Sequence, residues 1–84
     1  MDSKGAIRKY LAALLVQKGD PRAFDDDTPL LLGGRLDSID TVEIILFLEN
    51  EFRIQIAKDG FQRTQLDTVN SIDALVRASR PALD

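Results

Sequence analysis

Apolar residues recur every three or four positions in three separate stretches of this chain, and this spacing limits its fold more than any other feature. Such spacing predicts amphipathic helices, whereas a half-buried strand would need strict alternation. The apolar positions of the first stretch, about 3–18, are Ile7, Tyr10, Leu11, Leu14 and Leu15. Asp2 or Ser3 can cap this helix, and Gly19 can end it.

Two longer helices and one short one are predicted further along the chain. The second helix begins at Asp37 or Ser38, both good N-cap residues, and ends near residue 52. A single-turn segment over about 58–62 follows, with Phe61 as its expected core anchor. The last helix begins between residues 68 and 71 and ends near residue 79. The fold class is therefore all-α, a four-helix bundle with three longer helices and one short helix.

The first connection, about 19–37, is unusually long for so small a domain. Loops of this length inside small domains are usually functional or held by apolar anchors. We expect Phe24 and some of the three leucines at 30–32 to be these anchors. Gly33-Gly34 allows a tight turn, or a positive φ, directly before the second helix.

The composition excludes several classes of function. The 84 residues include no His and no Cys, which removes the commonest general base, every disulfide and every thiolate metal site. We therefore expect neither an enzyme nor a metal site. The net charge of −3 disfavours nucleic-acid binding. The longest apolar run is far shorter than the roughly 20 residues of a membrane span, so we expect no membrane insertion.

A single domain is expected over 1–84, with its core at about 3–79 and a frayed tail at 80–84. The first residues lack the apolar segment of a signal peptide. We therefore expect a cytoplasmic monomer that binds or carries something.

The second predicted helix has two apolar faces. At about 100° per residue, its core side consists of Thr41, Ile44, Ile45, Leu48 and Phe52. Ile39, Val42 and Leu46 lie on nearly the opposite side, among charged residues. Either the long loop folds over this second stripe, or the stripe is a docking patch for a partner. Periodicity alone leaves both interpretations open.

Ser38 stands where the glycine-containing loop meets a helix N-terminus. The simpler interpretation is an ordinary helix cap. The functional one is a hydroxyl available for covalent modification, because a phosphodiester attached there would lie near free backbone N–H groups and the positive end of the helix dipole. Asp37 could then bind the cation of a modifying enzyme. As a nucleophile in its own right, Ser38 lacks an activating base.

The residues 34–43, GRLDSIDTVE, resemble the phosphopantetheine attachment motif of acyl carrier proteins. The likeness continues through 44–52 and covers the helix order of the whole chain, so it implies a single acyl-carrier-like domain. It implies that Ser38 carries 4′-phosphopantetheine through a phosphodiester. A separate phosphopantetheinyl transferase would add the group from coenzyme A, using Mg²⁺. The thiol of that group would hold an acyl or aminoacyl cargo as a thioester.

The resemblance also implies a docking surface and partners. Asp37 would flank the attachment site and contribute to recognition by the transferase. The implied docking positions on the second helix are Ile39, Asp40, Val42, Glu43, Leu46 and Glu49. The implied partners are the transferase, a ligase that loads the cargo, and downstream transfer enzymes.

The pattern Gly34-x-Leu36-Asp37-Ser38 is closer to D-alanyl carrier proteins than to the carrier of fatty-acid synthesis. Asp40, Leu66 and Val69 differ from the residues usual in D-alanyl carriers. The cargo therefore stays open between acyl and aminoacyl groups of fatty-acid or secondary metabolism.

An apolar cavity that shelters an acyl chain is a further possibility. Its candidate lining residues are Ile45, Phe47, Leu48, Phe61 and Leu66. The alternative from another functional class is a noncovalent interaction module that docks through its second helix and does not need Ser38.

Overall fold

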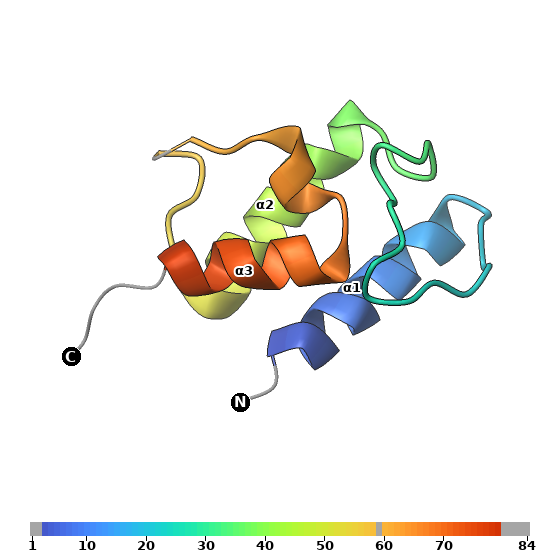
Figure 1. Cartoon of the computed structure of the whole chain (residues 1–84), viewed down its shortest axis with the longest axis horizontal. Helices are drawn as coiled ribbons and strands as arrows, with labels where there is room; N and C mark the ends of the chain where they lie inside the picture. The colour runs from blue at the N-terminus through green and yellow to red at the C-terminus, as the bar shows by residue number, and fades with distance from the viewer. Residues whose placement is uncertain (1–2, 59, 80–84) are drawn as a thin grey trace.

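Helices make up the regular structure of the chain in a computed structural model that describes residues 3–58 and 60–79. Their order is α1 (Ser3–Gln17), α2 (Ser38–Phe52), the 3-10 turn η1 (Arg63–Leu66) and α3 (Val69–Ser79). This confirms the predicted all-α class with three longer helices, one short one and a long first loop (Figure 1). The predicted frayed tail at 80–84 lies outside the described residues.

The core lies where the four elements meet. α1 packs against α3, and η1 contacts both α2 and α3, as Figure 1 shows. Fully buried side chains come from every element, among them Leu11, Leu48, Leu66 and Ile72. Each such side chain contributes about 1.5–3 kcal/mol relative to an exposed one, whereas an exposed ion pair contributes about 0–1 kcal/mol. Apolar burial therefore holds the helices together.

The long loop between α1 and α2 is held by contacts with the segment between η1 and α3. Leu30 and Leu31 are buried, whereas Leu32 is exposed. The buried carboxylate of Asp67, which follows η1, accepts hydrogen bonds from the backbone N–H groups of Leu31 at 2.9 Å and Leu32 at 2.7 Å. The Leu30 N–H donates to the Asp67 carbonyl at 2.8 Å. The expected leucine anchors are thus confirmed for two of the three residues, and Asp67 adds a polar anchor that the sequence did not reveal.

The short helical segment differs from its predicted position. It lies at 63–66 rather than 58–62, and Leu66, not Phe61, is its core anchor. Phe61 is 39% exposed. The reason is that Ile54 and Ile56, directly after α2, are buried in the core instead. Their burial leaves the chain around residue 61 on the surface.

Two further helix ends follow the prediction, whereas the possible cap Asp2 of α1 lies outside the described residues. Gly19 adopts a positive φ of 82° two residues after the end of α1. Thr68 precedes α3, and its hydroxyl accepts from the Ser71 N–H at 2.9 Å while its own N–H donates to the Ser71 hydroxyl at 3.0 Å. Within the described part of the chain, no helix is long and apolar enough to cross a membrane.

Candidate functional site

Ser38 is the first residue of α2 and is exposed. Its carbonyl accepts a hydrogen bond from the Thr41 hydroxyl at 2.5 Å. Within residues 3–58 and 60–79, its own hydroxyl takes part in no hydrogen bond. Of the two predicted cap residues, Asp37 is the helix cap and Ser38 is not. The Ser38 hydroxyl is therefore accessible at the positive end of a helix.

Asp37 caps α2 through a reciprocal pair of hydrogen bonds. Its carboxylate accepts from the N–H groups of Ile39 at 3.0 Å and Asp40 at 3.1 Å. The Asp40 carboxylate in turn accepts from the Asp37 N–H at 2.9 Å, which completes a capping box. The backbone N–H of Asp40 is the main cause that holds the pKa of Asp37 below its ordinary value. This capping box fixes the backbone on both sides of Ser38.

Lys18, one residue beyond the end of α1, joins this capping box. Its ammonium lies 2.8 Å from a carboxylate oxygen of Asp40 and 3.4 Å from one of Asp37. The hydrogen bond to Asp40 is the main cause that raises the pKa of Lys18 above its ordinary value. Because these residues are far apart in sequence, no local pattern could have identified the contact.

The placement of Asp40 corrects one expectation. Asp40 is only 5% exposed and faces the Asp37 backbone and Lys18. It therefore does not lie among the exposed charges around the second stripe, where the resemblance placed it. The reason is that Asp40 is the third helical residue, the position from which an acidic side chain reaches back to the N-cap.

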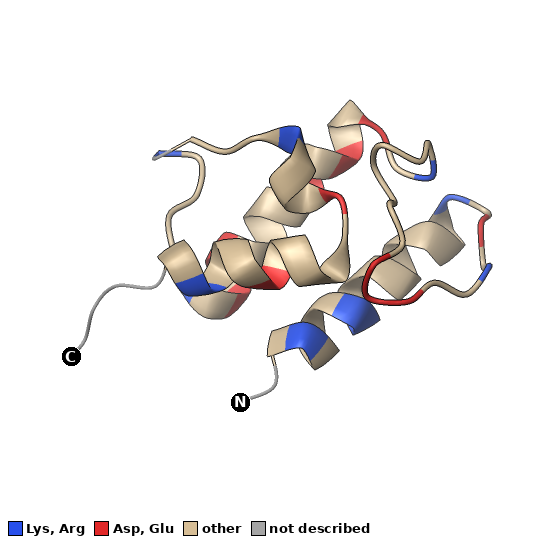
Figure 2. Ribbon diagram, viewed as in Figure 1, with Lys and Arg blue, Asp and Glu red and all other residues tan. Residues whose placement is uncertain are grey.

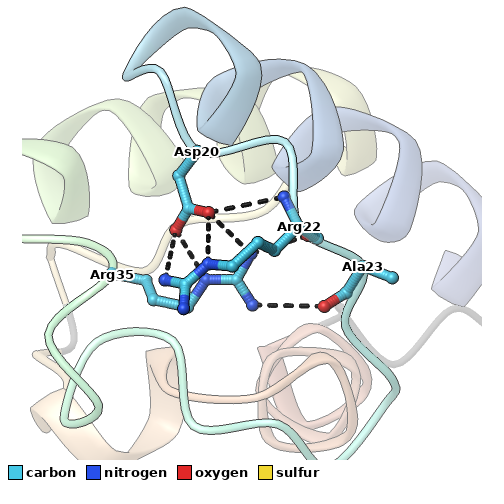
Figure 3. Close-up of polar contacts among 4 residues, drawn as sticks. All are labelled: Asp20, Arg22, Ala23 and Arg35. Carbon is cyan, nitrogen blue, oxygen red and sulfur yellow. Dashed lines mark hydrogen bonds and ion pairs between the residues drawn. The ribbon is translucent and has the colours of Figure 1, made fainter.

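The segment before Ser38 is held by Arg35, whose side chain is 12% exposed (Figure 3). Its guanidinium donates to Asp20 at 2.8 Å and to the carbonyls of Arg22 at 2.7 Å and Ala23 at 3.3 Å. Arg22 and Arg35, in that order of strength, hold the pKa of Asp20 far below its ordinary value. The two ends of the long loop are thereby joined.

Glycine is required at each of the two positions before Arg35, for a different structural reason. Gly34 has a φ of 87°, in the region that favours glycine. A Cβ on Gly33 would lie 2.1 Å from the carbonyl oxygen of Pro29. Both observations confirm the tight turn predicted before α2.

The second apolar stripe of α2 is exposed. Ile39 is 73%, Val42 58% and Leu46 59% exposed, so the long loop does not cover them. We call these three residues the exposed stripe. Figure 2 shows acidic positions on α2 and in the segment that leads into its first turn.

Glu43 and Glu49 differ in their surroundings. Glu43 is exposed. Glu49 is half-buried, and its carboxylate accepts from the N–H groups of Ile56 at 2.8 Å and Ala57 at 3.0 Å. The Ala57 and Ile56 N–H groups hold the pKa of Glu49 below its ordinary value. Glu43 is thus free to face a partner, whereas Glu49 organises the chain after α2.

Of the residues expected to line an acyl cavity, only three come together, and they do so inside the core. Ile45, Leu48 and Leu66 are buried in the core, and Phe61 is exposed. Phe47 stacks on Tyr10 of α1, with ring centroids 4.1 Å apart. Phe47 instead borders a surface hollow of about 470 Å³ that also includes Tyr10, Glu43, Leu46 and Asn50.

No group of three metal-ligating side chains occurs within residues 3–58 and 60–79. The chemistry available at Ser38 is therefore that of an accessible hydroxyl at a helix N-terminus, beside two carboxylates and one ammonium.

Comparison with known proteins identifies relatives over most of the chain, although no protein-family profile matches it. A D-alanyl carrier protein of Leuconostoc mesenteroides is 33% identical over 78 residues, which are 93% of this chain and 96% of that protein. D-alanyl carrier protein 1 of Lactiplantibacillus plantarum is 33% identical over 89% of this chain and 90% of its own length. A D-alanyl carrier protein of Streptococcus mutans is 35% identical over 86% of this chain and 87% of its own length.

These relatives are carrier proteins rather than enzymes, as the composition predicted for this chain. They also confirm the resemblance to carrier proteins over most of the chain. The chain belongs to the D-alanyl carrier protein family.

Proposed function

We propose that Ser38 carries 4′-phosphopantetheine and that the chain shuttles an acyl or aminoacyl group between partner enzymes. The observation that supports this most directly is the exposed Ser38 hydroxyl, which makes no hydrogen bond within residues 3–58 and 60–79. It lies at the start of α2, inside the motif that resembles the attachment site. The group supplies a thiol that holds the cargo as a thioester, which a chain without Cys cannot supply itself.

The residues around Ser38 fit an attached phosphodiester. A helix N-terminus favours an anion through its dipole, although the N–H groups of Ile39 and Asp40 already donate to Asp37. In the attachment reaction, the Ser38 oxygen bonds to a phosphorus of the coenzyme A diphosphate, the P–O–P linkage breaks, and 3′,5′-ADP leaves. The hydroxyl proton passes to a base, which the transferase must supply because Ser38 has none beside it that is not already hydrogen-bonded as a helix cap.

Mass spectrometry tests this proposal. Incubation with coenzyme A, Mg²⁺ and a broad-specificity phosphopantetheinyl transferase is expected to add about 340 Da to the wild-type chain. Ser38→Ala should gain nothing, and Ser3→Ala, which keeps Ser38, should gain the full mass. The proposal fails if the wild type gains no mass or if Ser38→Ala gains as much.

D-alanine is the first cargo to test, because the relatives are named D-alanyl carriers. A ligase that activates D-alanine with ATP should add about 71 Da more to the modified chain. Short fatty-acyl groups, offered through an acyl-activating ligase, are the competing cargo. Loading of only fatty-acyl groups would keep the carrier function and refute the D-alanyl assignment. The partners in this proposal are the transferase, the loading ligase and a downstream transfer enzyme, all cytoplasmic.

The exposed stripe is the proposed docking surface for these partners. Val42→Asp and Leu46→Asp place a charge on side chains that are 58% and 59% exposed, so we expect each variant to keep its helix content and most of its stability. Transfer to or from a partner should fall about tenfold or more, as expected when a central apolar contact is lost. Ala13→Asp, an exposed change on α1, is the control. If Val42→Asp unfolds the domain, the stripe is part of the core.

The second candidate is a noncovalent interaction module, which the exposed stripe would support without any role for Ser38. The same mass measurement separates the two candidates. A wild-type chain that gains no mass but binds a loading ligase through Val42 and Leu46 would favour this alternative.

A further inference from the structure

Lys18 reaches the attachment site from a different helix. Its backbone N–H donates to the carbonyls of Leu14 and Leu15, both at 3.1 Å, so its backbone is fixed at the end of α1. From there its side chain, 30% exposed, extends to the carboxylates of Asp37 and Asp40. These carboxylates lie on either side of Ser38 in the sequence.

The two contacts of Lys18 are unequal. The ammonium lies 2.8 Å from Asp40, which is almost fully buried, but 3.4 Å from Asp37, whose side chain is 61% exposed. The contact with Asp40 is therefore the firmer one, and the contact with Asp37 is weak and open to solvent. An exposed ion pair of this length contributes little and is easily exchanged.

Arg35, the basic residue nearest to Ser38 in the sequence, already has other partners. Arg35 lies three residues before Ser38, but its guanidinium is bonded to Asp20 and to two loop carbonyls. Among residues 3–58 and 60–79, Lys18 is the basic residue that forms ion pairs with Asp37 and Asp40. A phosphodiester on Ser38 would thus add a third negative charge near Asp37 and Asp40, which share the ammonium of Lys18.

We propose that Lys18 positions the phosphodiester of the modified protein by exchanging its weak contact with Asp37 for a phosphate oxygen while it keeps Asp40. This inference rests on the proposed modification of Ser38. In that arrangement, the base of the prosthetic arm is joined to the end of α1 as well as to α2. Lys18 is thereby a positioning residue, and the chemistry of attachment still belongs to the transferase.

The test compares unmodified and modified protein in four chains: wild type, Lys18→Met, Lys18→Arg and Lys9→Met. Lys9 is an exposed lysine on α1 and serves as the matched control. Modification should lower the unfolding midpoint of Lys18→Met by about 2–5 °C more than that of the wild type, as expected for one charge pair in a domain of this size. Lys18→Arg should behave like the wild type, and so should Lys9→Met. In 1 M salt the difference should vanish, because the charges are screened.

A second measurement follows the modified protein by NMR. In the wild type, the side-chain NMR resonances of Lys18 should shift on modification, whereas those of Lys9 should not. The ³¹P resonance of the phosphodiester should differ between modified wild type and modified Lys18→Met. These signals report on contact with the phosphate and would not change if Lys18 only stabilised the capping box.

Three results would overturn the inference. The first is a midpoint change on modification that is equal in the wild type and Lys18→Met, even if both forms of the variant are less stable. The second is an unshifted Lys18 resonance in the modified wild type. The third is a wild-type chain that gains no mass, which refutes the modification of Ser38 itself. Because the first two require a chain that has gained about 340 Da, they refute the role of Lys18 and leave the carrier function standing.

Discussion

The two connections on either side of α2 are held in different ways. The connection before α2 is long, but buried leucines, the Asp67 carboxylate and the Arg35 guanidinium fasten it at several points. The connection after α2 begins with Arg53 in the left-handed region and is held by Ile54, Ile56 and the Glu49 carboxylate. Phe61, further along, is exposed.

The two connections therefore differ in the number of their anchors as well as in their length. Closing a longer loop costs only slightly more entropy, whereas each satisfied buried backbone group avoids a penalty of about 1–3 kcal/mol. The better-anchored connection is the one that leads into Ser38. The segment that leads to the attachment site is therefore held by Asp20, which follows α1, and by Asp67, which follows η1.

The largest loss of stability is expected from Asp67→Ala, which removes the main polar anchor of the connection before α2. The variant removes the acceptor of two backbone N–H groups, one of them in the buried residue Leu31. We expect a loss of about 2–3 kcal/mol in the free energy of unfolding, measured by urea titration. Asp67→Asn keeps one carbonyl oxygen in the same place and should lose less than half as much. Equal losses in the two variants would mean that the charge, not the hydrogen bonding, holds the loop.

A smaller loss of stability, which depends on pH, is expected from Arg35→Met. The variant loses the contacts of the guanidinium with Asp20 and two carbonyls, at a cost of about 1–2 kcal/mol at pH 7. Because the pKa of Asp20 is lowered in the folded state, the stability that this carboxylate contributes is present above its unfolded pKa of about 4. This contribution is lost as the pH falls towards the folded-state pKa.

The stability difference between wild type and Arg35→Met should therefore narrow between pH 5 and pH 2, where urea titrations can follow it. Arg63→Met is the control, because Arg63 is an exposed residue of η1 that does not pair with Asp20. A difference that stays constant over this range would mean that only the carbonyl contacts of Arg35 matter.

The smallest change in stability is expected from Glu49→Gln, which alters the contacts of α2 with the connection that follows it. The amide oxygen can still accept from Ile56 or Ala57, but the charge that strengthens both bonds is lost. We expect the amides of Ile56 and Ala57 to exchange hydrogen about threefold to tenfold faster, with little change in global stability. Glu51→Gln, on the exposed side of α2, should leave both amides unchanged. Faster exchange throughout α2 would show instead that Glu49 supports the whole helix.

Much of the site was predictable because it depends on local rules. The beginning of α2 follows from an Asp-Ser cap sequence, and the opposite directions of Ile44 and Val42 follow from the helical repeat. The glycine turn before Arg35 was predictable for the same reason. By contrast, the roles of Asp40, Glu49 and Asp67 were missed or misplaced. Their carboxylates bind backbone N–H groups whose positions depend on how the loops run.

The misplaced short helix has a similar cause. Phe61 is the larger apolar residue, and sequence alone favours it as the anchor of the segment after α2. The core space is instead filled by Ile54, Ile56 and Leu66. Which apolar residue is buried depends on the path of the chain between two helices, and a residue count does not contain that path.

The sequence by itself determined the three long helices, the two-faced α2 and the position of Ser38 at a helix N-terminus. These features arise from the helical repeat and from caps within a few residues. Only the tertiary structure decided that the second stripe of α2 stays uncovered and that Lys18 reaches the attachment site. Both depend on contacts between segments distant in sequence, since periodicity sets the direction of a side chain but not what lies opposite it.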